Sequence, residues 1–306
     1  MDILDIGIIG ASTRGRGLAE AAALAGLNVN LVELNKETLD RGIRKIGEEM
    51  DHLIEKWGLT DSEKKAAMAR IKGITSLEDL EKKCQMVIVT VREDLDLNKD
   101  IFARLDAHMS PATILVTHSA ILSVTEIATA TQRPDKVAGI TFLPPVVRVQ
   151  LGEVVRGLKT SQETYETVTM FINDRLGKTA VEVAEAPGYI SIRMLVNMIN
   201  EAMYLVMEGI ASIEDIDTSM KLGFDMKRGP FEIADKVGLD MVLVWTKYMY
   251  KEAGYRYNAP CPLLLKLVRA NNLGKKTGEG FYKYDESGKI IGVGALSQMK
   301  KWSYNV

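Results

Sequence analysis

The sequence predicts an α/β fold in which a doubly wound sheet over residues 1–186 is followed by an all-helical domain over residues 187–306. Short apolar runs alternate with helical segments through the first part, and this is the pattern of a parallel sheet with helices on both faces. From Pro187 onward, helical segments rich in Leu, Met and Val replace that alternation. We therefore expect a domain boundary near Pro187.

Individual elements follow from the spacing of apolar residues. Apolar runs predict strands at 6–9, 29–32, 86–91, 113–117, 137–142, 153–155 and 180–183, with a short extended piece beginning at Ile74. Helical spacing predicts helices over 36–57, 96–105, 161–176 and 189–207, a helical turn over 77–80, and a helix after the capping box Ser123–Glu126.

The composition indicates a globular cytoplasmic protein. It contains 46% hydrophobic and 26% charged residues and has a formal net charge of −2, so nothing suggests binding to nucleic acid or an anionic membrane. No apolar run approaches the ~18 residues of a membrane-spanning helix. The first strand begins too early for a signal peptide. Cys84 and Cys261 lack metal-ligand spacing with any histidine, so we predict buried thiols and no metal site.

The stretch from Ile6 to Gly17 carries the strongest functional signal. An apolar strand, a glycine-containing loop and a helix of small residues are followed by a second strand that ends in Glu33. This is the order of a Rossmann-type βαβ unit, in which the helix N-terminus binds a pyrophosphate and the terminal acid binds a ribose diol. The motif predicts NAD as cofactor, with Ser12 in place of the middle glycine of G-x-G-x-x-G.

Residues predicted to contact the cofactor come from the loop, the second strand and the region after the third strand. They are Gly10, Ser12, Thr13, Arg14, Gly15, Glu33, Glu93 and Lys99. Gly10 permits the tight turn, and Gly15 lets the helix pack closely on the strand. Arg14 and Arg16 either contact the pyrophosphate or point into solvent, and solvent is the orientation we expect.

Short sequence blocks then follow one another along nearly the whole chain. They are Gly15-Arg-Gly17-Leu-Ala19, Leu122-Ser-Val-Thr-Glu-Ile127, Arg133-Pro-Asp-Lys-Val137, Val183-Ala-Glu-Ala-Pro-Gly188, Glu214-Asp-Ile-Asp217, Met220-Lys-Leu-Gly223, Gly229-Pro-Phe-Glu232, Val268-Arg-Ala270 and Leu273-Gly-Lys-Lys-Thr-Gly-Glu-Gly-Phe-Tyr282. In these blocks the chain resembles the L-3-hydroxyacyl-CoA dehydrogenase family, especially the bacterial 3-hydroxybutyryl-CoA dehydrogenases. The resemblance implies an NAD-dependent oxidoreductase that transfers hydride between nicotinamide and C3 of a short-chain acyl-CoA.

The resemblance also implies a two-domain dimer with acyl-CoA bound in the cleft between the domains. The apolar surface that carries Met194, Met198, Met203 and Met207 fits burial against a second copy of the chain, and packing within one chain is the alternative. We therefore predict a homodimer joined through the helical domain.

By the same resemblance, most of the family's catalytic positions carry different residues here. The block that holds the family's histidine base reads Thr141-Phe-Leu-Pro-Pro145, and the glutamate that orients this base is kept as Glu153. The family's serine falls at Ala120 and its asparagine at Ile192. A threonine hydroxyl is a poor base near neutral pH. His118 is either a relocated base or an ordinary hydrogen-bonded loop residue. The predicted catalytic positions are Glu153, His118, Thr141, Ala120 and Ile192.

In the family, the helix that follows the ribose-binding acid carries lysines that attract the CoA phosphates. Here its polar face carries Glu48, Glu49, Asp51 and Glu55, with Lys56 and His52 as the predicted substrate-binding residues. Such a cluster of acids repels a ligand with several negative charges. We expect His52 and His108 to lie in solvent on helices.

Three functions remain open from the sequence. The first, and the one we favour, is NAD-dependent dehydrogenation of 3-hydroxybutyryl-CoA to acetoacetyl-CoA or the reverse. The second is a repurposed dehydrogenase for another substrate, such as a 3-amino or imine compound paired with Glu153. The third is a catalytically silent paralogue that binds NAD or an acyl group. In each case the predicted ligands are small molecules, and no partner is a nucleic acid or a membrane.

Overall fold

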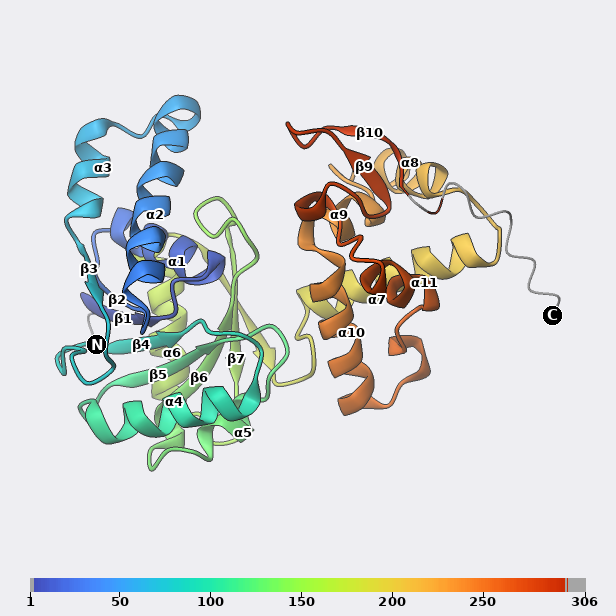
Figure 1. The fold of residues 1–306 in the computed structure, drawn as a ribbon. Helices are drawn as coiled ribbons and strands as arrows, with labels where there is room; N and C mark the ends of the chain where they lie inside the picture. The colour runs from blue at the N-terminus through green and yellow to red at the C-terminus, as the bar shows by residue number, and fades with distance from the viewer. Residues whose placement is uncertain (1–2, 295, 297–306) are drawn as a thin grey trace. The chain divides into compact units, whose positions relative to one another are not determined.

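The computed structural model describes residues 3–294 and 296 of the chain. Two compact units, Met1–Tyr189 and Ile190–Val306, make up the protein (Figure 1). We propose that the domain boundary lies at Pro187, close to this division.

An eight-stranded sheet forms the centre of the first unit. Its strands are β1 (Asp5–Ile9), β2 (Asn28–Val32), β3 (Ile71–Ile74), β4 (Met86–Val89), β5 (Ile114–His118), β6 (Val137–Thr141), β7 (Leu151–Arg156) and β8 (Thr179–Ala184). Their order is β3-β2-β1-β4-β5-β6-β7-β8, and neighbours are parallel except β6 and β7. The chain order reverses between β1 and β4, where doubly wound sheets bind ligands. The predicted fold class is confirmed.

Helices cover both faces of this sheet. They are α1 (Thr13–Leu24), α2 (Lys36–Trp57), α3 (Asp61–Met68), α4 (Leu95–His108), α5 (Val124–Ala128) and α6 (Gln162–Met170), the last continued by a π-helical turn at Phe171–Arg175. Strands β4 and β5 are buried along their whole length. Continuous burial explains why both read as unbroken apolar runs in the sequence.

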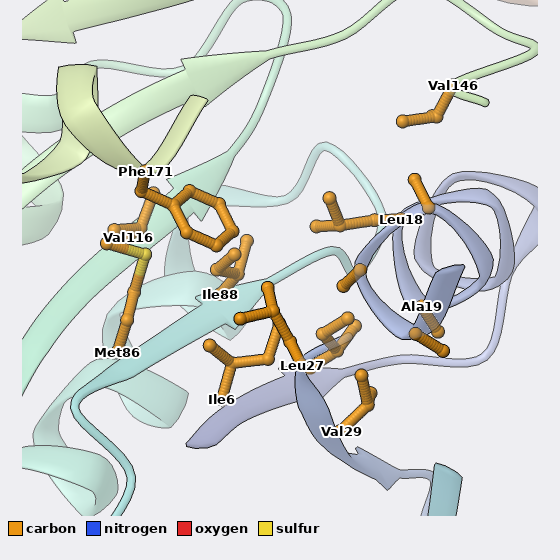
Figure 2. Packing of buried hydrophobic residues seen from close by; sticks show 14 of the residues in the cluster. Ile6, Leu18, Ala19, Leu27, Val29, Met86, Ile88, Val116, Val146 and Phe171 are labelled. Carbon is orange, nitrogen blue, oxygen red and sulfur yellow. The ribbon is translucent and has the colours of Figure 1, made fainter. Parts of the chain in front are cut away.

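The core beneath the cofactor loop joins β1 and β4 to α1 and to the end of α6. Ile6, Ile88, Leu18 of α1 and Phe171 belong to one buried cluster (Figure 2). All four side chains are buried, and each such burial stabilises the fold by about 1.5–3 kcal/mol. This packing fixes α1 on the sheet and so sets the position of its N-terminus.

Three local elements of the first unit differ from the sequence prediction. The strand β3 ends at Ile74, where we expected an extended piece to begin. Residues 77–80 form a hydrogen-bonded turn, from the Leu80 amide to the Leu77 carbonyl, and no helix. Helix α3 is additional; Thr60 and Glu63 form a complete capping box at its start.

The second unit is helical, as predicted, with one addition. Its helices are α7 (Ser191–Met207), α8 (Ile213–Gly223), α9 (Pro230–Val237), α10 (Leu239–Ala253) and α11 (Pro262–Arg269). Strands β9 (Tyr282–Tyr284) and β10 (Ile290–Val293) pair antiparallel as a hairpin, so the unit is not all-helical. The lysine- and glycine-rich sequence around this hairpin has no apolar run long enough to have predicted it.

Two buried aspartates fasten the hairpin to the helices. Asp217 of α8 accepts a hydrogen bond from the Tyr282 hydroxyl at 2.9 Å. Asp235 of α9 accepts the amides of Phe281 at 2.9 Å and Tyr282 at 2.8 Å, and the hydroxyl of Tyr284 at 3.0 Å. Burial raises the pKa of both carboxyls, that of Asp235 to about 6. The paired donors therefore compensate for the loss of water around these groups.

Candidate active site

The loop between β1 and α1 requires glycine at two of its predicted positions. Gly10 has φ of 105°, a left-handed conformation that side chains disfavour. A Cβ atom on Gly15 would lie 1.9 Å from the Gly10 carbonyl oxygen. The loop therefore turns tightly and α1 starts directly against the sheet.

The N-terminus of α1 offers an anion site. The amide of Arg16 donates to the Ser12 carbonyl at 2.8 Å, and the amides before it belong to the first turn, where a helix leaves its donors unused. Ser12 has φ of −67° and ψ of 175°, an extended backbone that any residue adopts, so replacement of glycine does not strain the loop. Its hydroxyl donates to the Thr90 carbonyl at 3.3 Å. A pyrophosphate fits this arrangement.

Glu33 follows β2 at the same edge of the sheet. Its carboxylate accepts the Ala11 amide at 3.3 Å, and its side chain is half-buried. A carboxylate beside the loop suits the two hydroxyls of an adenosine ribose and repels a 2′-phosphate. The residues present therefore fit NAD. The described hydrogen bonds place Glu33 and the loop together, as the sequence predicted.

Neither arginine of the loop points freely into solvent, contrary to our expectation. Arg14 Nη1 lies 2.6 Å from Glu93 Oε1, and the exposed side-chain fractions are 21% and 4%. Arg16 is also mostly buried, and its Nη1 donates to the Ala11 carbonyl at 3.3 Å. Arg16 Nη2 also lies 3.5 Å from Glu49 Oε1 of α2. The sequence did not reveal Glu93 and Glu49 as partners because they come from other elements.

Two other predicted cofactor residues are less tightly defined. Thr13 is exposed at the first position of α1. Lys99 lies on α4 with its Nζ 3.6 Å from Glu126 Oε1, in a partly exposed pair. Their contact with the cofactor stays a prediction.

The predicted catalytic residues of the first unit lie at or just after the ends of β5 and β6 and on the neighbouring strand β7. Thr141 is the last residue of β6 and pairs directly with Glu153 of β7, so both side chains lie on the same face of the sheet. Both are buried. The Thr141 hydroxyl donates to the carbonyl of Ser119, the residue before Ala120. Ile192 is buried in α7 of the second unit.

His118 has a structural role in this arrangement. Its Nε2 accepts the Phe142 amide at 3.2 Å, and its ring stacks on the Phe142 ring at 5.8 Å. Burial, and then the charge of Arg14, lower the pKa of His118 to about 3. The imidazole is therefore neutral and its basic lone pair is already used. This geometry favours the hydrogen-bonded alternative over a relocated base.

Ser119 is a residue that sequence reasoning missed. Its hydroxyl donates to Glu93 at 2.5 Å and accepts the amides of Ile121 at 3.1 Å and Leu122 at 2.8 Å. Ser119 directly precedes Ala120, a predicted catalytic position, and this was the signal in the sequence that could have identified it.

Comparison with known proteins identifies the family. Residues 5–186 match the model described as "3-hydroxyacyl-CoA dehydrogenase, NAD binding domain", and residues 188–284 match "3-hydroxyacyl-CoA dehydrogenase, C-terminal domain". The chain belongs to the 3-hydroxyacyl-CoA dehydrogenase family. This confirms the predicted resemblance, NAD as the cofactor, and the assignment as an NAD-dependent oxidoreductase.

Individual family members match over nearly their full length. The chain is 41% identical to a probable 3-hydroxybutyryl-CoA dehydrogenase of Bacillus subtilis, over 94% of this chain and 99% of that protein. It is 37% identical to the 3-hydroxybutyryl-CoA dehydrogenase of Clostridioides difficile, over 92% and 100%. The crystal structure of (S)-3-hydroxybutyryl-CoA dehydrogenase from Ralstonia eutropha superimposes with a TM-score of 0.88 at 38% identity, covering 93% of this chain and 100% of that one.

The substrate-binding residues predicted from the family are exposed on α2. His52 Nδ1 lies 3.5 Å from Glu55 Oε2, and Lys56 lies in the last turn of the helix. Beside this turn a cavity of about 360 Å³ opens, lined by Leu53, Gly58, Leu59, Glu63, Val147 and Arg148. A substrate role for Lys56 and His52 stays a prediction.

His108 also differs from its sequence prediction. His108 is half-buried, and its Nε2 makes a hydrogen bond to the Leu80 carbonyl at 2.9 Å, so it is not solvated as we expected. Over residues 3–294 and 296, no cluster of three metal-binding side chains occurs. In the same part of the chain, no helix combines the length and apolarity needed to cross a membrane.

The buried His118 predicts an effect of pH on stability. Its folded pKa of about 3 lies below its ordinary value of 6.5, so at intermediate pH only the unfolded chain binds a proton there. The free energy of unfolding therefore falls as pH falls through this window. The variant His118→Asn keeps an acceptor for Phe142 but lacks the titration, so it should lose less stability in acid. Urea unfolding of both proteins at about pH 7 and about pH 4.5 measures this difference; equal losses would contradict it.

Proposed function

We propose that the protein interconverts 3-hydroxybutyryl-CoA and acetoacetyl-CoA with NAD(H), by hydride transfer at C3 of the acyl chain. The observation that carries the proposal is the match to 3-hydroxybutyryl-CoA dehydrogenases over almost the entire length of both chains, at 41% and 37% identity. The cofactor site supports it, since the glycines of the β1–α1 loop, the first-turn amides of α1 and the Glu33 carboxylate after β2 fit NAD.

Binding and orientation fall to the β1–α1 region. The first-turn amides of α1 would hold the pyrophosphate, and Glu33 would hold the ribose diol. When bound, NAD supplies the hydride chemistry: the oxidised form accepts a hydride and the reduced form donates one. The chain itself must then provide the proton transfer that accompanies the hydride.

We assign that proton transfer to Glu153. Ala120 and Ile192 carry no titratable group, and the Nε2 lone pair of His118 is used by the Phe142 amide. The Thr141 hydroxyl donates its hydrogen to the Ser119 carbonyl, so Thr141 has no hydrogen left to give to a substrate oxygen. The Glu153 carboxylate, opposite Thr141, takes the hydroxyl proton during oxidation and returns it during reduction.

The test follows NADH absorbance with acetoacetyl-CoA, after fluorescence has established that NADH binds. Turnover at ordinary enzymatic rates of about 1–10³ per second supports the proposed reaction. NADH binding without turnover overturns it, and parallel assays with 3-amino and imine compounds then separate a repurposed dehydrogenase from a silent paralogue.

We also propose that the enzyme is a cytoplasmic homodimer joined through the helical unit. Met203 and Met207 pack in the core of that unit, as in the alternative of packing within one chain, whereas Met194, Ile210, Leu222 and Phe224 are exposed. Exposed apolar surface of this kind is typical of an interface between subunits. Light scattering during size-exclusion chromatography should give twice the chain mass of 33.9 kDa.

A further inference from the structure

An ion pair crosses the position where the strand order reverses. Arg14 belongs to α1, which follows β1, and Glu93 follows β4, the neighbouring strand on the other side of the reversal. Their side chains meet at 2.6 Å. Arg14 Nη2 also donates to the Val91 carbonyl at 3.4 Å. The pair therefore bridges the two sides of the crevice in which a dinucleotide binds to such sheets.

Glu93 also holds the loop that follows β5. Its two carboxylate oxygens accept the Ser119 hydroxyl at 2.5 Å and the Ala120 amide at 3.1 Å. The Ser119 hydroxyl accepts the amides of Ile121 and Leu122, and the Ser119 carbonyl accepts the Thr141 hydroxyl. A carboxylate at position 93 thus positions the residues beside the proposed proton-transfer group.

This carboxylate creates an electrostatic conflict. Only 4% of the Glu93 side chain is exposed, so water screens its charge poorly. The crevice must also accept a pyrophosphate, which carries negative charge. Two anions in one poorly solvated crevice repel one another unless a cation lies between them or beside one of them.

We propose that Arg14 neutralises Glu93, so that the crevice can bind a pyrophosphate while Glu93 holds the loop after β5. Arg14 and Glu93 are thus positioning residues. The charge of Arg14 also contributes to the lowered pKa of His118, which shows that its field reaches the end of β5. The inference rests on NAD binding and goes beyond the proposed function, because it does not depend on the identity of the acyl substrate.

Fluorescence titration of NADH tests the compensation in the full-length protein. Arg14→Met leaves Glu93 without its cation and should raise the Kd for NADH roughly tenfold or more. Arg14→Lys keeps the charge, and the double variant Arg14→Met/Glu93→Gln removes both charges. Each of these should bind NADH within about threefold of the parent protein. Arg14→Gln offers the same comparison if the methionine variant does not fold.

The chain contains a matched control pair in the same loop. Arg92 Nη2 lies 3.0 Å from Asp94 Oδ2, but 76% and 37% of these side chains are exposed. Solvent screens this pair, so Arg92→Met should leave the Kd for NADH unchanged. Thermal unfolding of every variant without cofactor separates a change in stability from a change in affinity.

Several results would overturn the inference. If Arg14→Met and the parent protein bind NADH with equal affinity, Arg14 does not compensate for Glu93 and the inference is wrong. A double variant as weak as Arg14→Met would mean that Arg14 contacts the pyrophosphate itself and does not compensate for Glu93. Absence of NADH binding in the parent protein also overturns it. Absence of acetoacetyl-CoA turnover with the expected order of NADH affinities would overturn the proposed reaction alone.

Discussion

The variant Glu153→Gln is expected to lose roughly 10²- to 10⁴-fold in kcat for reduction of acetoacetyl-CoA, which is the usual contribution of a general acid or base. Only 2% of Glu153 is exposed, and it lies opposite Thr141 on the neighbouring strand. Glutamine has almost the same size, so it preserves the packing but cannot exchange a proton. Steady-state rates from NADH absorbance measure the loss.

A matched control lies on the next strand. Glu182 of β8 pairs in register with Val154 and its side chain is exposed. Glu182→Gln removes a carboxylate from the same sheet without touching the proposed site, so its kcat should equal that of the parent protein. NADH affinity, measured in parallel, shows whether Glu153→Gln affects only catalysis. A kcat for Glu153→Gln close to that of the parent protein would refute the assignment of Glu153.

Sequence patterns predicted the elements whose residues act locally. The unbroken apolar runs of β4 and β5 predicted buried parallel strands, because a strand covered on both faces has no polar side to display. The glycines of the β1–α1 loop predicted a tight turn, and the structure has φ of 105° at Gly10. Glu33 lies beside that turn, as expected from the βαβ order. These features depend on residues close together in the chain.

Features that depend on distant residues could not be predicted in the same way. The ion pair of Arg14 with Glu93 joins the first turn of α1 to the loop after β4, and β2, α2, α3, β3 and β4 lie between them in the chain, so no local pattern contains it. The hydrogen bond and ring contact of His118 come from Phe142, which directly follows the neighbouring strand β6. Periodicity also cannot distinguish a polar helix such as α3 from a loop, although its capping box at Thr60 and Glu63 was a usable signal.

The variant Gly280→Ala is expected to have the largest effect on stability. A Cβ atom at this position would lie 2.2 Å from Asp235 Oδ1 and 2.6 Å from the Gly274 Cα atom. The first of these atoms accepts the Phe281 amide, and Asp235 is a buried residue of α9. The Gly274 amide donates to the Glu279 carbonyl at 2.8 Å, so neither neighbour can move without breaking hydrogen bonds. We expect the free energy of unfolding to fall by about 3 kcal/mol or more.

Gly223→Ala is the matched control for this prediction. Gly223 is the last residue of α8, and a Cβ atom there would meet nothing within 4 Å among the described residues. Its substitution should therefore change the free energy of unfolding by less than about 0.5 kcal/mol. Urea denaturation of both variants measures the difference. If Gly280→Ala were as stable as Gly223→Ala, the hairpin would have to shift away from Asp235 at little cost. The buried hydrogen bonds of Asp235 would then contribute little to holding the hairpin against the helices.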